Sequence, residues 1–343
     1  MLAMRNDQTK TTSMKHKRRT DNNGGGKAMN ILCATDDKYA PYCGVMLTSF
    51  LENHKGFHTE VYIVVKNRLK EEKRLKRLEQ RYDVKVNIVE FPFSDITSSF
   101  PIGYRHWTIE MYYRLFAPVL LPKDIDRVLY LDCDIIVDGD VSEMYFSDIN
   151  NISALVCPDF FMYIKHKGWA THLGYEEEKG YFNSGVMFIN LDYWREHNIL
   201  ESCLEYLKTH HDILVYYDQD VLNYVLRDTK KFVNLEYNFL SNLISKGVYN
   251  SLDTATKNEI ISCHPRVIHF ISSKPWSIFS YKYTYVSIWD KYCKMSQWRK
   301  PLFQKLPKEK PFNYFIKRYF LWPLGIKMHN LEPTEEWKES SHG

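Results

Sequence analysis

Leu129-Tyr130-Leu131-Asp132-Cys133-Asp134 is the stretch that decides the fold. An apolar run followed by two carboxylates at positions i and i+2 is typical of a buried strand that ends in a polar loop. Both carboxylates can reach one divalent cation, and hard oxygen ligands suit Mg²⁺ or Mn²⁺, which often bridge to substrate phosphates. The stretch therefore predicts a metal site at the carboxyl end of a buried strand.

The sequence before this stretch alternates between strand and helix patterns. The expected elements, strand and helix in turn, are 31–35, 42–53, 60–65, 69–82, 84–91, 108–116 and 128–131. This alternation predicts an α/β fold with a mostly parallel, Rossmann-like sheet flanked by helices, whose ligands bind beyond the carboxyl ends of the strands. Asp36 and Asp37 follow the first strand, so we expect them at the same edge of the sheet as Asp132 and Asp134.

The second half of the chain is less regular. It contains strand patterns at 154–157 and 186–191 and helix patterns at 192–209 and 218–227. Three polar groups stand out: Asn183 in Tyr181–Val186, the pair Asp218-Gln219, and His269, which ends an apolar run five residues before Lys274. Amide and carboxyl side chains suit sugar hydroxyls, a histidine can ligate a metal, and a lysine can neutralise a phosphate.

Each of these features also has a purely structural interpretation. Asp36 can be a helix N-cap, His269 a hydrogen-bonded core histidine, and Asn183 and Asp218 polar groups of turns. The Asp132–Asp134 pair also has a rival in the haloacid-dehalogenase phosphatases, where the first aspartate is a nucleophile. That motif normally lies on the first strand of its domain, whereas about 100 residues of α/β pattern precede Asp132 here.

Composition excludes several classes of protein. The 343 residues are 44% hydrophobic and 26% charged, which fits a globular chain with a sizeable core. No apolar stretch approaches the roughly 20 residues of a membrane-spanning helix, and the basic N-terminus has no secretory pattern. Seven cysteines without a CxxC pair predict free thiols. The net charge of +4 is concentrated at the two ends of the chain, so the body is acidic and nucleic-acid binding is not expected.

Taken together, the motifs resemble those of family 8 glycosyltransferases. The residues that carry the resemblance, over about 30–280, are Ala34-Thr35-Asp36-Asp37, Tyr113-Arg114-Leu115, Leu129–Asp134, Phe182-Asn183-Ser184-Gly185-Val186, Asp218-Gln219-Asp220, and His269-Phe270 with Lys274-Pro275-Trp276. This family comprises retaining GT-A enzymes, among them bacterial lipopolysaccharide galactosyl- and glucosyltransferases and the glycogenins. The segment from His269 to Lys274 is one residue shorter than the family pattern HxxGxxKPW and lacks its glycine.

The resemblance implies a role for each matching residue. It implies Mn²⁺ (or Mg²⁺) ligands at Asp132, Asp134 and His269. It implies a UDP-glucose or UDP-galactose donor held by Ala34, Asp36, Arg114, Asp132, Cys133, Asp134 and Lys274. Sugar or acceptor contacts are implied for His106, Asp159, Asn183 and Asp218, and the catalytic positions are Asp218 and Gln219. The implied reaction transfers a hexose, with retention, to a glycan or lipid-linked acceptor in polysaccharide or lipopolysaccharide synthesis.

The two ends of the chain differ from the body. Residues 1–29 predict a disordered basic leader, residues 30–280 a catalytic domain, and residues 281–343 a helical, basic and aromatic extension. Residues 294–327 contain nine basic residues, one Glu and eight aromatics, which are Trp298, Phe303, Phe312, Tyr314, Phe315, Tyr319, Phe320 and Trp322. Basic charge interleaved with aromatic rings suits an anionic bilayer surface. We therefore expect a cytoplasmic enzyme attached peripherally to the inner face of the membrane, although these aromatics can instead cap the catalytic domain.

Two other functions stay open on the sequence alone. A phosphatase of the haloacid-dehalogenase type would release phosphate from small phosphoesters and ignore UDP. A catalytically silent relative would bind a UDP-sugar without turnover.

Overall fold

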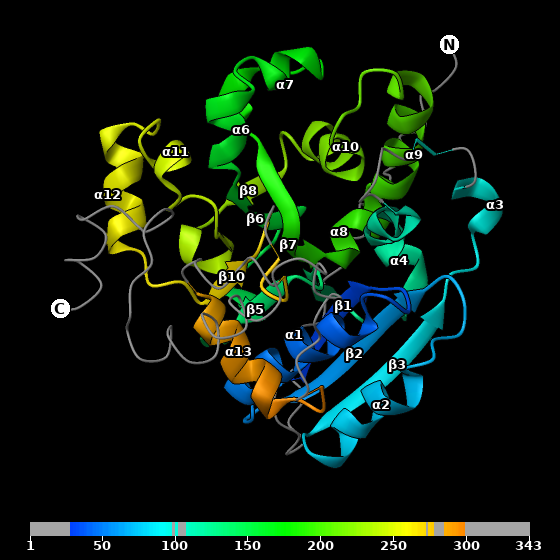
Figure 1. The fold of residues 1–343 in the computed structure, drawn as a ribbon. Coiled ribbons are helices and arrows are strands. Elements are labelled where there is room, and N and C mark those ends of the chain that lie inside the picture. Colours follow the sequence, from blue (N-terminus) through cyan, green and yellow to red (C-terminus); the bar gives the residue numbers. More distant parts are fainter. Residues whose placement is uncertain (1–27, 98–99, 102–107, 272–273, 278–284, 299–343) are drawn as a thin grey trace, which may run out of the picture.

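The computed structural model describes residues 28–97, 100–101, 108–271, 274–277 and 285–298, and a seven-stranded sheet lies at its centre (Figure 1). In spatial order the strands are β3 (Val84–Glu90), β2 (His58–Val65), β1 (Ala28–Ala34), β4 (Arg127–Leu131), β7 (Phe182–Asn190), β6 (Ala154–Pro158) and β8 (Lys230–Phe232). The first four are parallel, as predicted. β7 runs antiparallel to both β4 and β6, so the sheet is mixed.

A second, three-stranded sheet carries the chain beyond the end of β4. Its strands are β5 (Ile135–Val137), β10 (Val267–His269) and β9 (Phe239–Leu240), with β10 in the middle. β10 pairs antiparallel with β5, and His269 lies opposite Ile135. This register brings the end of β10 beside the loop that follows β4, although more than 130 residues separate them in the sequence.

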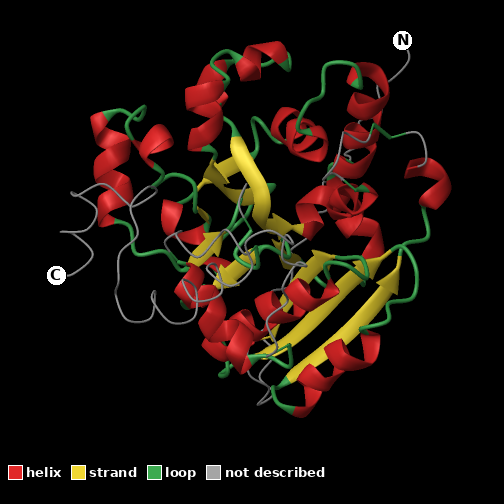
Figure 2. Cartoon of the chain, in the orientation of Figure 1, coloured by secondary structure: helices red, strands yellow, loops and turns green. Residues whose placement is uncertain are grey.

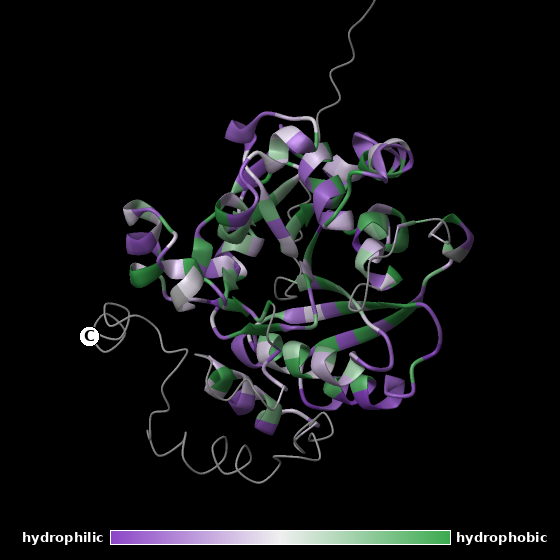
Figure 3. Cartoon of the chain, turned by 45° about the horizontal axis from the view of Figure 1, so that its top comes forward, coloured by the Kyte–Doolittle hydropathy of each residue, from purple (hydrophilic) through white to green (hydrophobic). Residues whose placement is uncertain are grey.

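Helices cover both faces of the large sheet (Figure 2). Along β4, Leu129 and Leu131 pack into one buried cluster while Val128 and Tyr130 pack into another, because successive side chains of a strand point to opposite faces. Figure 3 shows hydrophobic strands at the centre and hydrophilic residues along the outer helices. The polar loop after β4 therefore begins inside the molecule, between two packed layers.

The first cluster includes α1 (Ala40–Asn53), which is buried throughout from Tyr42 to Leu51. The remaining α-helices are α2 (Glu72–Lys76), α3 (Ser94–Thr97), α4 (Ala117–Leu120), α5 (Ser142–Tyr145), α6 (Phe160–Lys165), α7 (Trp169–His172), α8 (Leu191–Glu196), α9 (Ile199–His210), α10 (Tyr217–Val225), α11 (Lys246–Tyr249), α12 (Thr254–Ser262) and α13 (Val286–Met295). Short 3₁₀ helices are η1 (Arg77–Gln80), η2 (Ile109–Phe116), η3 (Glu177–Lys179) and η4 (Leu235–Tyr237).

Three expected helices differ from the structure. The segment 69–82 contains the short α2 and then η1, and the segment 108–116 is the 3₁₀ helix η2, which leads directly into α4 past Pro118. Proline is tolerated there because it lies in the first turn of α4. The segment 192–209 is two helices, α8 and α9, because Asn198 between them adopts a left-handed conformation with φ of 50°.

Trp298, the first aromatic of the basic segment 294–327, caps the catalytic domain, which is the second of the two roles expected for these aromatics. Trp298 is 2% exposed and belongs to the same core cluster as α1 and α13. Its ring fills the space that Gly44 leaves open, since a Cβ at Gly44 would lie 2.0 Å from the ring. The indole N–H also donates to Glu71 Oε2 at 2.8 Å. Trp298 is therefore part of the folded body and not of a membrane-facing set, whereas the other seven aromatics lie outside the described residues.

The boundaries at the ends of the body shift slightly. β1 begins at Ala28, two residues before the expected start of the packed domain, and residues 1–27 lie outside the described part of the chain. Within that part, we find no helix that is both long enough and apolar enough to cross a bilayer. All seven cysteines are free thiols, as predicted.

Candidate metal and nucleotide-sugar site

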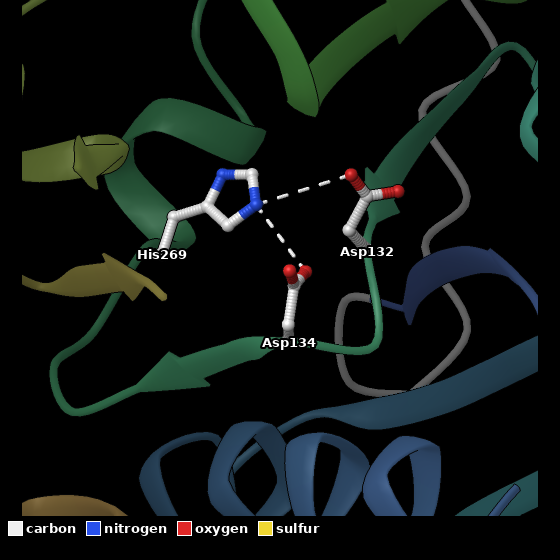
Figure 4. Close-up of side chains that lie close together, drawn as sticks. All are labelled: Asp132, Asp134 and His269. Atoms are coloured by element: carbon white, nitrogen blue, oxygen red, sulfur yellow. Dashed lines mark ion pairs between the residues drawn. The ribbon is translucent and has the colours of Figure 1, made fainter. Parts of the chain in front are cut away.

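Three potential metal ligands converge where the two sheets meet. Asp132 follows β4, Asp134 precedes β5, and His269 ends β10, and the three side chains point toward one another (Figure 4). One ligand atom of each lies within 4.8 Å of the others. His269 Nε2 is 3.2 Å from Asp134 Oδ1 and 4.0 Å from Asp132 Oδ2. Two carboxylates and an imidazole form a donor set that fits Mn²⁺.

A glycine lets β7 pass close to this cluster. The backbone N–H of Asp132 donates to the Gly185 carbonyl at 2.9 Å. A Cβ at Gly185 would lie 2.2 Å from His269 Cε1 and 2.8 Å from Asp132 Oδ2. Any side chain at this position would therefore displace two of the three potential ligands.

Lys274 pairs with the second carboxylate. Its ammonium group contacts Asp134 Oδ2 and donates to the Phe270 carbonyl at 3.1 Å. Burial raises the pKa of Asp134, but Lys274 and His269 outweigh burial and hold that pKa well below its usual range. The ring of Trp276 stacks on Tyr42 of α1 at 3.6 Å, which anchors the segment that carries Lys274. The shortened segment after His269 thus still brings Lys274 to the cluster.

Arg114 joins the first carboxylate to the opposite side of the site. Its guanidinium, 4% exposed, donates to Asp132 Oδ1 at 2.8 Å and lies 3.1 Å from Asp218 Oδ2. It also donates to the Ser184 carbonyl at 2.6 Å. Tyr130 donates to the same Asp132 oxygen at 2.8 Å, which is consistent with its position two residues earlier on the same face of the strand. Arg114 therefore fixes Asp132 relative to Asp218.

A network of amides and carboxyls lies beyond Arg114. Gln219 Oε1 accepts from the Ser184 backbone N–H at 3.1 Å and from Asn183 Nδ2 at 3.3 Å. Asp159 Oδ2 accepts from Asn183 at 3.3 Å and from Gln219 at 3.4 Å. Burial raises the pKa of Asp159, and it raises the pKa of Asp218 to about 7 even though Arg114 lowers it. This side of the site is buried and polar, and burial shifts both carboxyls toward their protonated forms.

The last residue of β1 lies against the loop that carries the carboxylates. The thiol of Cys133 donates to the Ala34 carbonyl at 3.2 Å. Asp36 Oδ1 accepts from the Tyr39 backbone N–H at 2.7 Å, so Asp36 caps the turn that leads into α1. The structure therefore agrees with the capping role expected for Asp36. The contact uses only one of the two oxygens of this half-buried carboxylate.

Contacts thus join the described sequence-predicted site residues into one site, with the exception of Asp36, whose side chain contacts Tyr39. His106 lies outside the described residues. Sequence reasoning assigned no role to Tyr130, Ser184 or Asn238, although Tyr130 lies two residues before Asp132 and Ser184 lies inside the quoted motif Phe182–Val186. Asn238 is an isolated polar residue 31 positions before His269, and its contact with that ring appears only in the fold.

Comparisons with known proteins agree with this geometry. The sequence profile described as glycosyl transferase family 8 matches residues 30–278. A Haemophilus influenzae relative is 28% identical over 213 residues, 62% of this chain and 64% of that protein, so the chain spans less than two thirds of that relative. The lipopolysaccharide 1,2-glucosyltransferase of Escherichia coli (strain K12) is 29% identical over 298 residues, 85% of each chain.

Among solved structures, the galactosyltransferase LgtC in complex with donor and acceptor sugar analogs matches with a TM-score of 0.69 and 22% identity. The match covers 82% of this chain and 98% of that one. This likeness confirms the GT-A fold that the sequence resemblance implied.

Proposed function

The chain belongs to glycosyl transferase family 8, and from that membership we propose a metal-dependent, retaining hexosyltransferase. It moves glucose or galactose from UDP to a hydroxyl of a glycan or lipid-linked acceptor, in the synthesis of lipopolysaccharide or another cell-surface polysaccharide. The similarity to the E. coli lipopolysaccharide glucosyltransferase and to the galactosyltransferase LgtC supports this range of sugars.

The observation that carries the proposal is the cluster of Asp132, Asp134 and His269. The side chain of Lys274 pairs with Asp134, and that of Arg114 pairs with Asp132. A bound Mn²⁺ (or Mg²⁺) would supply positive charge to the diphosphate leaving group. This charge would lower the activation barrier of transfer by several kcal/mol. Lys274, beside Asp134, adds a second positive charge for the leaving phosphate. Arg114 keeps Asp132 in place and faces the donor.

The residues around β1 hold the nucleoside end of the donor. Ala34 and Asp36 offer backbone and carboxyl groups to the uridine, and Cys133 packs its thiol against Ala34. UDP is the expected nucleotide, because family resemblance at Ala34 and Asp36 supports uridine over adenosine or guanosine.

The network of amides and carboxyls holds the sugar. Asp159 and Asn183 bind hydroxyls, and His106 contacts the donor or acceptor. Retention needs either a nucleophile on the face opposite UDP or attack by the acceptor on the same face as the leaving group, in which the departing phosphate takes the acceptor proton. Asp218 and Gln219 are the residues that serve the reacting carbon in either route.

The phosphatase alternative is not favoured. Its nucleophile would be Asp132, and one oxygen of that carboxylate accepts from both Arg114 and Tyr130. The family membership also accounts for the later motifs, which a phosphatase does not need.

A donor screen tests the proposal. Purified protein is incubated with UDP-glucose, UDP-galactose, ADP-glucose or GDP-mannose in Mn²⁺, and release of the nucleoside diphosphate is followed with and without candidate glycan acceptors. We expect release from at least one UDP-sugar, its increase with acceptor, and its loss in EDTA. Binding of a UDP-sugar without any release would instead identify a catalytically silent relative.

We also propose that residues 1–27 are dispensable and that residues 299–327 bring the enzyme to the inner face of the membrane. The truncation must leave Trp298 in place, because that ring is in the core. A chain that ends at Trp298 should keep Mn²⁺-dependent UDP release and no longer sediment with vesicles of phosphatidylglycerol and phosphatidylcholine. The full chain should bind them less at 1 M than at 0.1 M salt, because the Debye length falls from about 10 Å to about 3 Å. Vesicle binding by the truncated chain would refute this role.

A further inference from the structure

The imidazole of His269 is held from behind by two amides. His269 Nε2 faces the carboxylates of Asp132 and Asp134, while Nδ1 lies 3.1 Å from Asn183 Oδ1 and 3.2 Å from Asn238 Oδ1. Asn238 immediately precedes β9 and is fully buried, with 0% exposure. Its side-chain amide also donates to Asn183 Oδ1 at 3.0 Å.

The orientation of both amides follows from one backbone group. The N–H of Gly185, which can only donate, points at Asn183 Oδ1 at 3.1 Å, so that atom must be the oxygen of the amide. The atom of Asn238 that faces this oxygen must then be its NH₂ group, which leaves the Asn238 oxygen facing His269. A chain of fixed donors thus presents two acceptors to Nδ1.

Two acceptors at Nδ1 decide which ring nitrogen carries the proton. In the neutral ring the proton resides on Nδ1, where both oxygens accept it, and Nε2 keeps the lone pair that a metal ligand needs. Partners of this kind, on the far side of a ligating histidine, fix both its tautomer and its ring orientation.

We propose that Asn238 is a positioning residue that prepares His269 to ligate the metal through Nε2. The inference rests on the metal site of the proposed function. Among the described residues, the side chain of Asn238 forms its hydrogen bonds with Asn183 and His269. Its polar atoms therefore hold the His269 ring and the Asn183 amide in place. Asn183 has further partners in Asp159 and Gln219, whereas Asn238 acts on the metal side.

Binding of Mn²⁺ to metal-free protein tests the inference without any turnover. Free Mn²⁺ is measured by electron paramagnetic resonance during titration of the wild type, Asn238→Leu and Asn238→Asp, and melting temperatures are recorded in EDTA. Leucine has a similar size but no acceptor, and we expect 10- to 100-fold weaker Mn²⁺ binding, the usual cost of losing such a partner. Aspartate keeps an acceptor for Nδ1 but places an oxygen against Asn183 Oδ1, so it should lower the melting temperature and retain Mn²⁺ affinity within about threefold.

Asn190→Leu is the matched control. Asn190 ends the same strand, β7, near whose start Asn183 lies, and its amide donates to the carbonyls of Ile149 and Ile152. Its loss should lower the melting temperature without changing the affinity for Mn²⁺. A merely structural role for Asn238 makes the opposite prediction, that Asn238→Leu and Asn190→Leu behave alike.

The outcomes separate the two proposals. Tight binding by the wild type and equally tight binding by Asn238→Leu would overturn the positioning role alone. Absence of Mn²⁺ binding by the wild type would overturn the metal site and this inference with it. If Asn238→Leu does not fold, Asn238→Asp decides: affinity near that of the wild type supports the role, and a loss beyond tenfold refutes it.

Discussion

The two sides of the site are built from different chemistry. The metal side consists of the carboxylates of Asp132 and Asp134, the ammonium group of Lys274 that pairs with Asp134, and the imidazole of His269. The sugar side consists of buried amides and carboxyls joined by hydrogen bonds, in Asp159, Asn183 and Gln219. Paired charges can exchange partners with a cation and a diphosphate, whereas a network of amide and carboxyl groups can form hydrogen bonds with hydroxyls. This difference supports the proposal that the two sides recognise the two ends of one donor.

The largest effect should come from the metal side. Asp134→Asn removes a potential ligand and the partner of Lys274, and we expect turnover to fall about 10³-fold, or ~4 kcal/mol. The protein should lose some stability with the partner of Lys274 but stay folded, because asparagine has the same size and leaves the packed core unchanged. Asp148→Asn, on an exposed loop, is the control and should turn over like the wild type. Near wild-type turnover by Asp134→Asn in Mn²⁺ would refute the assignment.

A change on the sugar side should have a smaller and different effect. Gln219→Ala removes the amide that orders Ser184 and Asn183, and we expect kcat to fall about 10²-fold through misplacement of the sugar. Steady-state kinetics at several Mn²⁺ concentrations check this. The concentration of Mn²⁺ needed for half-maximal rate should not change, and a shift of more than a few-fold would mean that the two sides are not separate.

Gly185 lies between the two sides, so it tests where they meet. Gly185→Ala places a methyl group against His269 and Asp132, and we expect at least tenfold weaker Mn²⁺ binding and a loss of about 1–3 kcal/mol in the free energy of unfolding. Gly247→Ala, with no atom within 4 Å of the added Cβ, is the control. Unchanged Mn²⁺ affinity in Gly185→Ala would show that the cluster can move without loss of function.

The smallest effect concerns Asp218, which Arg114 joins to the metal side, and the way its titration makes the stability of the protein depend on pH. The pKa of Asp218 rises from the ordinary 3.8 to about 7 in the folded protein. Between these values the folded state holds a proton that the unfolded chain has lost, so this carboxyl makes stability fall as pH rises from about 4 to about 7. The amide of the variant Asp218→Asn cannot titrate. In EDTA, the melting temperature of the variant minus that of the wild type should therefore increase from about pH 4 to about pH 7 and stay constant above that. A difference that is constant from pH 4 to pH 8 would contradict the pKa shift.

The metal side was largely predictable from sequence, and its geometry was not. Asp132 and Asp134 follow a local pattern, an apolar strand that ends in carboxylates, which needs no knowledge of distant residues. His269 was assigned only through family resemblance, because its approach depends on β10 pairing with β5, a contact between residues far apart in the chain. The antiparallel direction of β7 was missed for the same reason, since periodicity identifies a strand but not its neighbours.

The ends of the body show the same limit. Trp298 belongs by composition to a basic, aromatic segment, and by structure to the core beside Gly44. Only the absence of a side chain at Gly44, some 250 residues earlier, makes room for the ring. The role of Asn238 could not be predicted from the sequence, because a single polar residue belongs to no periodic pattern. Its contact with His269 depends on donors that only the fold brings around it.

The measurement that tests the division of the site most directly is titration of UDP into Asp134→Asn and Gln219→Ala by calorimetry, with saturating Mn²⁺ and the wild type as reference. We predict that UDP binds Asp134→Asn at least tenfold more weakly than the wild type. Gln219→Ala should bind UDP like the wild type, because the proposed function assigns the diphosphate to the metal side. The account would be contradicted if both variants bound UDP as tightly as the wild type, or if both bound it more weakly to the same extent.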